Sequence, residues 1–171
     1  MTEAEPDAAH TALLQHRADI AVIHSYSLLP RPLPPGCEQR HLLDEPVFLV
    51  LHPDDAAPYG LKPGGKADLR RLADATSLLP GPETACHRMT QRACGAAGFV
   101  PRPVAVAGDF AVVTALAARR AGVTLVPRLA LPPSVPGISV HPLARPVHRS
   151  IHASTAQAPQ TARKSASYSM D

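Results

Sequence analysis

The stretch "DFAVVTALAARRAGVTLVPRLAL", residues 109–131, constrains the fold most. Strong helix formers fill residues 110–121, and Gly122 can end a helix because glycine accepts a positive φ without a Cβ clash. The β-branched run 123–126 follows at once and is closed by Pro127. A helix joined to an apolar strand by so short a link is typical of βαβ units. The stretch therefore predicts an α/β domain with buried strands.

The rest of the chain repeats this alternation of helix and strand. The run "ADIAVI", residues 18–23, is almost wholly apolar, as in parallel strands buried on both faces, so we expect mainly parallel pairing. Four prolines in residues 28–36 exclude a helix or central strand there, and Pro46 predicts a bend or bulge in the extended segment 37–53. Further helices are expected at 7–16, 68–74 and 83–99, and further strands within 76–82, 102–109, 137–143 and 148–155.

Composition excludes several classes of protein. The formal charge of +3 is spread along 171 residues, which does not indicate a phosphate-binding surface. The three cysteines are far apart and odd in number, so a reducing compartment fits better than a disulfide framework. Residues 1–7 are acidic, unlike a signal peptide, and no apolar run reaches the ~18 residues of a membrane span. We expect a soluble, cytoplasmic protein.

No set of residues predicts catalysis, a cofactor or a metal. There is no G-x-S-x-G elbow, and the carboxylate pair Asp44–Glu45 is explained by turn chemistry. The spacing of "GLKPGGKA", residues 60–67, resembles a P-loop but lacks the final Ser or Thr. His148 and His152 share one face of a strand without a third ligand nearby. We therefore expect no enzyme; turnover that depended on Cys86 or His87 would overturn this.

Five segments occur in an order that resembles the effector-binding domain of LysR-type transcriptional regulators, over about residues 3–155. They are "ADIAVI", "HLLDEPVFLVLHPDDA", "ADLRRLADATSLL", "RACGAAGFVPRPVAVAGDFAVVTALAARRAGVTLVPRLAL" and "GISVHPLARPVHRSIHAST". The resemblance implies a two-lobed α/β fold like that of type 2 periplasmic binding proteins, with two crossovers and an effector in the cleft. Lobe I would comprise residues 1–53, lobe II 54–145 and the return crossover 146–156, followed by a disordered tail, 157–171.

The family pattern is incomplete at both ends of this sequence. The winged helix-turn-helix, the linker helix, the first strand and helix of lobe I and the C-terminal helix have no counterpart. The resemblance therefore implies a truncated sensing domain that reaches DNA only through a segment absent here. In the full-length family such domains form homo-oligomers. We expect lobe I to be poorly stabilised unless a partner chain supplies the missing strand. A stand-alone solute-binding protein of the same fold is the alternative.

In the family, strand-to-helix turns that face the cleft hold the effector. The corresponding residues here are His24, Ser25, Tyr26, Pro82, Glu83, Thr84, Ala85, Gly108, Asp109 and Phe110. Free N–H groups at helix starts suit a carboxylate, so a small anionic metabolite is expected. Glu83 and Asp109 oppose this by placing negative charge nearby, although both also suit helix starts. The interpretation that these residues are only caps and turns stays open.

Overall fold

The computed structural model describes residues 1–133 and 136–157. Its helices are α1 (Pro6–Leu14), α2 (Ala85–Ala96) and α3 (Phe110–Ala117), and its strands are β1 (Ala21–Tyr26), β2 (Cys37–Leu51), β3 (Thr76–Leu79), β4 (Arg102–Val106), β5 (Thr124–Pro127), β6 (Ser139–Pro142) and β7 (His148–Ala156). Short 3-10 helices lie at Pro53–Asp55 (η1), Ala57–Tyr59 (η2), Leu69–Leu72 (η3) and Arg128–Ala130 (η4). These helices are all too short or too polar to span a lipid bilayer. The predicted tail, apart from Gln157, lies outside the described residues.

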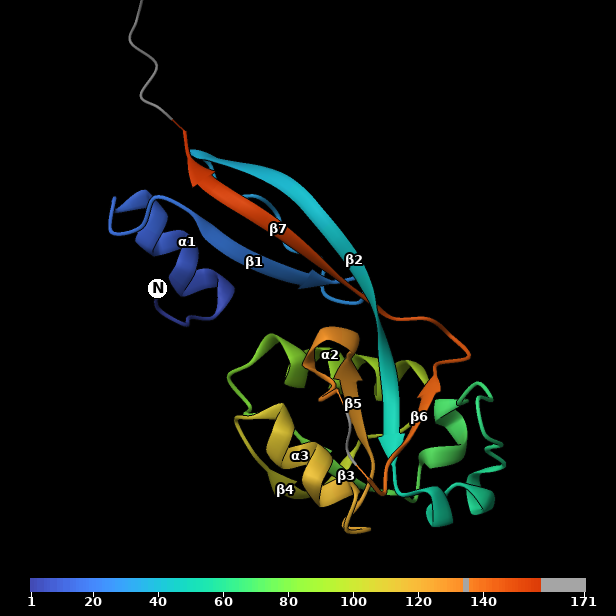
Figure 1. Ribbon diagram of the computed structural model, residues 1–171. Coiled ribbons are helices and arrows are strands. Elements are labelled where there is room, and N and C mark those ends of the chain that lie inside the picture. The colour runs from blue at the N-terminus through green and yellow to red at the C-terminus, as the bar shows by residue number, and fades with distance from the viewer. Residues whose placement is uncertain (134–135, 158–171) are drawn as a thin grey trace, which may run out of the picture.

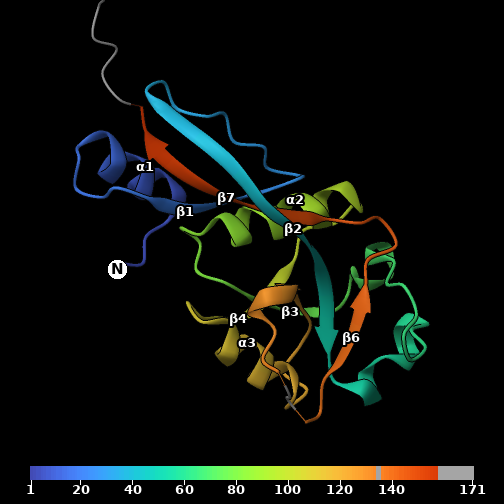
Figure 2. The same cartoon turned by 45° about the horizontal axis from the view of Figure 1, so that its top comes forward.

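Strand β2 belongs to both ends of the molecule (Figure 1). Its first part, up to Pro46, pairs antiparallel with β7, which pairs with β1 on its other edge. From Val47 onward, β2 lies between β5 and β6 and pairs antiparallel with both. The turned view in Figure 2 shows α1 with β1 and β7 at one end, and α3 with β3 to β6 at the other. The protein thus has two lobes, between which β2 passes.

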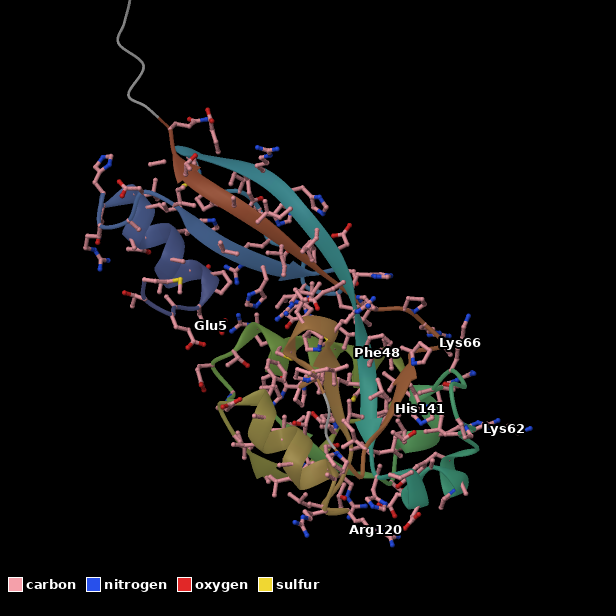
Figure 3. The ribbon with its side chains drawn as sticks, in the orientation of Figure 1. Glu5, Phe48, Lys62, Lys66, Arg120 and His141 are labelled. Atoms are coloured by element: carbon pink, nitrogen blue, oxygen red, sulfur yellow. The ribbon has the colours of Figure 1, made fainter. Side chains whose placement is uncertain are left out.

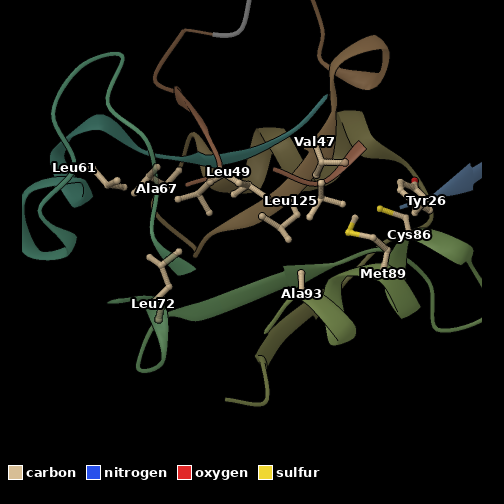
Figure 4. Packing of buried hydrophobic residues seen from close by; sticks show 14 of the residues in the cluster. Tyr26, Val47, Leu49, Leu61, Ala67, Leu72, Cys86, Met89, Ala93 and Leu125 are labelled. Carbon is tan, nitrogen blue, oxygen red and sulfur yellow. The ribbon is translucent and has the colours of Figure 1, made fainter. Parts of the chain in front are cut away.

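The larger lobe is built around apolar side chains from sheet and helices. Leu49 of β2, Met89 of α2 and Leu125 of β5 are buried in one cluster, which extends to Tyr26 and Cys86 (Figure 4). Burial of such side chains contributes roughly 1.5–3 kcal/mol each to folding. Because Tyr26 comes from β1 and Cys86 from α2, this core reaches the junction between the lobes. The predicted lobe boundaries remain predictions.

Strand pairing differs from the expectation of mainly parallel strands. Among the described pairings, only β3 with β4 and the isolated bridges Ser77–Val123 and Ala67–Leu143 are parallel. The long strands β2 and β7 run in opposite directions between the lobes, which makes their ladders antiparallel. The expectation that "ADIAVI" is buried on both faces is also wrong: Ile23 is 2% exposed but Val22, on the opposite face of β1, is 69% exposed. The register shift in β2 lies between His41 and Leu43 rather than at Pro46.

The junction between α3 and β5 is as short as predicted, but its geometry differs. The helix ends at Ala117, and the residue with left-handed φ is Arg120, at 63°. Gly122 has a positive φ of 157°, outside the left-handed helical region, and a Cβ there would lie 2.6 Å from the carbonyl oxygen of Thr76. That carbonyl accepts a hydrogen bond from the N–H of Val123 at 2.9 Å. The glycine therefore lets the start of β5 approach β3.

Candidate functional site

A cavity of about 730 Å³ lies where the two lobes meet. One wall contains His24 and Tyr26 of β1 and Arg149 of β7, and the facing wall contains the segments that precede α2 and α3. Glu5, which precedes α1, lies between the lobes beside this cavity (Figure 3). The complete lining is Glu3, Ala4, Glu5, His24, Tyr26, Pro80, Glu83, Thr84, Cys86, Gly108, Asp109, Phe110, Leu129, Ala130 and Arg149.

Most of the predicted site residues line this cavity. The structure brings together His24, Tyr26, Glu83, Thr84, Gly108, Asp109 and Phe110. Ser25 lines only a second cavity of about 310 Å³, whose lining also includes His24, Tyr26, Arg31 and His152. Its side chain points away from those of its neighbours because successive residues of a strand alternate between faces. Pro82 is exposed outside the lining, and Ala85 is buried but contributes its N–H at the start of α2.

Acceptors of the chain itself occupy N–H groups at both helix starts. Glu5 Oε2 accepts a hydrogen bond from the N–H of Ala85 at 3.1 Å, across the gap between the lobes. Thr84 Oγ1 accepts from the N–H of His87 at 3.1 Å, and Asp109 Oδ1 accepts from the N–H of Ala111 at 2.7 Å. These contacts are typical helix caps and satisfy donors that otherwise lack a partner. Three of the donors at these helix starts are therefore already engaged by the chain itself.

A buried ion pair joins the paired strands β2 and β7 beside the cavity. Glu45 of β2 has a side chain only 3% exposed, and Arg149 of β7 is 13% exposed. One carboxylate oxygen of Glu45 accepts from Arg149 Nε at 2.5 Å, and the other accepts from the N–H of Leu129 at 2.5 Å. This single carboxylate links β2, β7 and η4. The sequence-based interpretation of Asp44–Glu45 as turn chemistry is therefore wrong for Glu45.

Apart from Glu45, the titratable groups beside Arg149 in the cavity lining are His24, Tyr26 and Cys86. Burial, followed by repulsion from Arg149 and Arg31, lowers the pKa of His24 to about 4. The His24 ring packs edge-on against Tyr26, with ring centroids 5.5 Å apart. Burial raises the pKa of the Tyr26 hydroxyl and raises the pKa of the Cys86 thiol to about 11. A thiol that stays protonated is a poor nucleophile.

Several lining residues were missed by sequence reasoning. Glu3 and Glu5 belong to the acidic start of the chain, which had served only to exclude a signal peptide. Leu129 and Ala130 directly follow β5, so the rule that ligands lie at the carboxyl ends of strands could have found them. Nothing local in the sequence marks Arg149, because its role depends on a partner 104 positions away.

Comparisons with known proteins point to one family. A family model described as the LysR substrate binding domain matches residues 1–165. A cysteine mutant of OxyR from Corynebacterium glutamicum has 22% identity and a TM-score of 0.74 over 94% of this chain and 49% of that chain. The C-terminal domain of a probable LysR family regulator from Rhodococcus sp. RHA1 has 23% identity and a TM-score of 0.71, covering 94% and 77%.

The effector-binding domain of BenM, solved with its effector benzoate, has 19% identity and a TM-score of 0.70 over 94% of this chain and 71% of that chain. No curated protein matches the sequence. The chain spans about half the length of the full-length regulators that it matches. These structures establish the two-lobed fold, and the family match covers nearly the whole chain.

Proposed function

Because the chain belongs to the LysR substrate binding domain family, a family of transcriptional regulators, we propose that it binds a small-molecule effector between its lobes. The observation that carries this proposal is the cavity of about 730 Å³ whose walls come from both lobes and from β7. Its size lies in the range of small-molecule sites. The BenM domain, which has the same fold, was solved with a small effector.

The cavity supports a sensing role for physical reasons. A ligand that contacts both lobes has a different affinity for each relative arrangement of the lobes, so its binding shifts the equilibrium between arrangements. In the regulators of this family, we propose, this shift modulates DNA-dependent transcription. We also propose that the full-length regulator forms homo-oligomers and contacts DNA. This proposal includes a cytoplasmic location. We assign the chain no catalytic role.

A thermal-shift screen of metabolites, followed by calorimetry of the compounds that raise Tm, tests the proposal. Gly108 lines the cavity, and a Cβ placed there meets no atom within 4 Å, so Gly108→Trp is the substitution chosen to fill the cavity. Gly95 of α2 is equally unobstructed but lies outside the lining, which makes Gly95→Trp the matched control. Ligands should stabilise the wild type and the control but not Gly108→Trp. Equal binding to all three proteins, or no ligand at all, would contradict the proposal.

A further inference from the structure

We infer that the effector carries a cationic amine or guanidinium group. The inference rests on the proposed function, because it concerns the ligand of that same cavity. It replaces the expectation of an anionic metabolite, which came from the mild positive charge of the whole chain and from the helix starts. The local charges, the aromatic lining and the engaged donors each point to a cation.

The cavity is acidic although the chain as a whole carries a formal charge of +3. Glu3, Glu5, Glu83 and Asp109 line it, and none of them forms an ion pair with a cation within residues 1–133 and 136–157. The lining contains a single Arg, Arg149, whose charge is balanced by Glu45 at 2.5 Å. Carboxylates around a partly enclosed space concentrate positive ligands and repel negative ones.

An aromatic ring adds a second preference for cations. Phe110, which is half-buried, lines this cavity at the start of α3, whereas Tyr26, also in the lining, is only 2% exposed and packs into the core. Ring faces attract ammonium and guanidinium groups, by about 0.5–2 kcal/mol per contact. His24 does not compete with a bound cation, because its lowered pKa leaves the ring neutral.

An anion, by contrast, finds few free partners in the cavity. The N–H groups of Ala85, His87 and Ala111 already donate to the side chains of Glu5, Thr84 and Asp109. A ligand carboxylate at the start of α2 would have to displace the carboxylate of Glu5 and would then lie beside it. Two carboxylates of the chain itself, those of Glu5 and Asp109, thus lie at positions where an anion would bind at the helix starts.

The test is calorimetry at pH 7.5 with probes sorted by charge. The cationic probes are agmatine and spermidine, the anionic probes are succinate and benzoate, and a wider screen of amines and acids follows the same division. We expect the compounds that bind to be cations and their affinity to fall as NaCl is added, because salt screens the attraction. Binding that is strongest for an anion would overturn the inference and leave the proposed function intact. If no compound binds, the proposed function fails and the inference fails with it.

Charge-removing variants supply the second measurement. Glu83→Gln and Asp109→Asn keep the shape of each side chain, and Asn still accepts the capping hydrogen bond that Asp109 makes. Each should weaken a bound cation about threefold to tenfold. Glu38→Gln, at an exposed position of β2 outside the lining, is the matched control and should change nothing. Unchanged affinity in both cavity variants would also overturn the inference.

Discussion

Gly122 shows how one residue can be predicted correctly for an incorrect reason. The sequence predicts that Gly122 ends a helix. In the structure, the absence of a side chain at Gly122 leaves room for the carbonyl of Thr76, which lies where a Cβ would be. The residue that adopts left-handed φ, Arg120, carries no such mark in the sequence. Local composition can therefore locate the junction, whereas the atom that requires the glycine comes from a strand 46 positions earlier.

A pair of Gly→Ala substitutions tests this assignment. Gly122→Ala should lower the free energy of unfolding by about 1–3 kcal/mol, because the added methyl overlaps the Thr76 carbonyl. Gly95→Ala should raise the free energy of unfolding by about 0.5–1 kcal/mol, because the site is helical and unobstructed. Urea unfolding followed by circular dichroism measures both. Equal effects of the two substitutions would refute the steric account.

A second prediction for a single residue concerns His24, whose lowered pKa should make the stability of the protein depend on pH. Its pKa is about 4 in the folded protein, below the ordinary 6.5, so between these values the unfolded chain binds a proton that the folded protein does not. Stability should therefore fall as pH drops from 6.5 to 4, by up to about 3 kcal/mol from this group. The difference between the unfolding curves of the wild type and His24→Gln across this range isolates the contribution. Parallel curves would show that His24 is protonated freely in the folded state.

At the scale of elements, the sequence predicted where helices and strands lie along the chain, but it did not predict which strands pair with each other. The periodicity and caps of α2 and α3 are local, and both helices lie where the sequence predicts them. The pairing of β1 depends on β7, more than 120 residues away, so an apolar run could not reveal which face is covered. The predicted parallel order failed for this reason.

Two substitutions in β1 test which face is buried. Ile23 is 2% exposed and Val22 is 69% exposed, so the strand has one dry face. Ile23→Thr should lower the free energy of unfolding by about 2–3 kcal/mol, through lost burial and a buried hydroxyl. Val22→Thr should change it by less than about 0.5 kcal/mol. Chemical denaturation measures both, and similar large losses would restore the picture of a strand buried on both faces.

At the scale of the whole molecule, the candidate site is assembled from segments that only the fold brings together. The family resemblance led to the strand-to-helix turns that form much of the cavity lining. Glu5 and Arg149 could not be found in this way, because their contacts join the lobes and depend on three-dimensional placement. The parts that come from local motifs were therefore predictable, and the parts that connect the lobes were not.

The buried pair of Glu45 and Arg149 should stabilise the connection between the lobes. Glu45→Gln leaves the guanidinium of Arg149 without its counter-charge in a nearly dry setting, which should cost about 3–5 kcal/mol of stability. The double variant Glu45→Gln with Arg149→Met removes the unpaired charge and should recover part of the loss. Thermal unfolding of the two variants provides the comparison. A double variant less stable than Glu45→Gln would contradict this account.

Strand β2 also determines where the molecule can flex. Its hydrogen bonds tie it to β7 up to Pro46 and to β5 and β6 from Val47 onward, so neither ladder extends past this point. Pro46 has no N–H to donate and its ring fixes φ, while the N–H of the next residue, Val47, donates to the carbonyl of Val147 at 2.9 Å. We expect any change in the angle between the lobes to be taken up by the few peptide units on either side of Pro46, where the partners of β2 change.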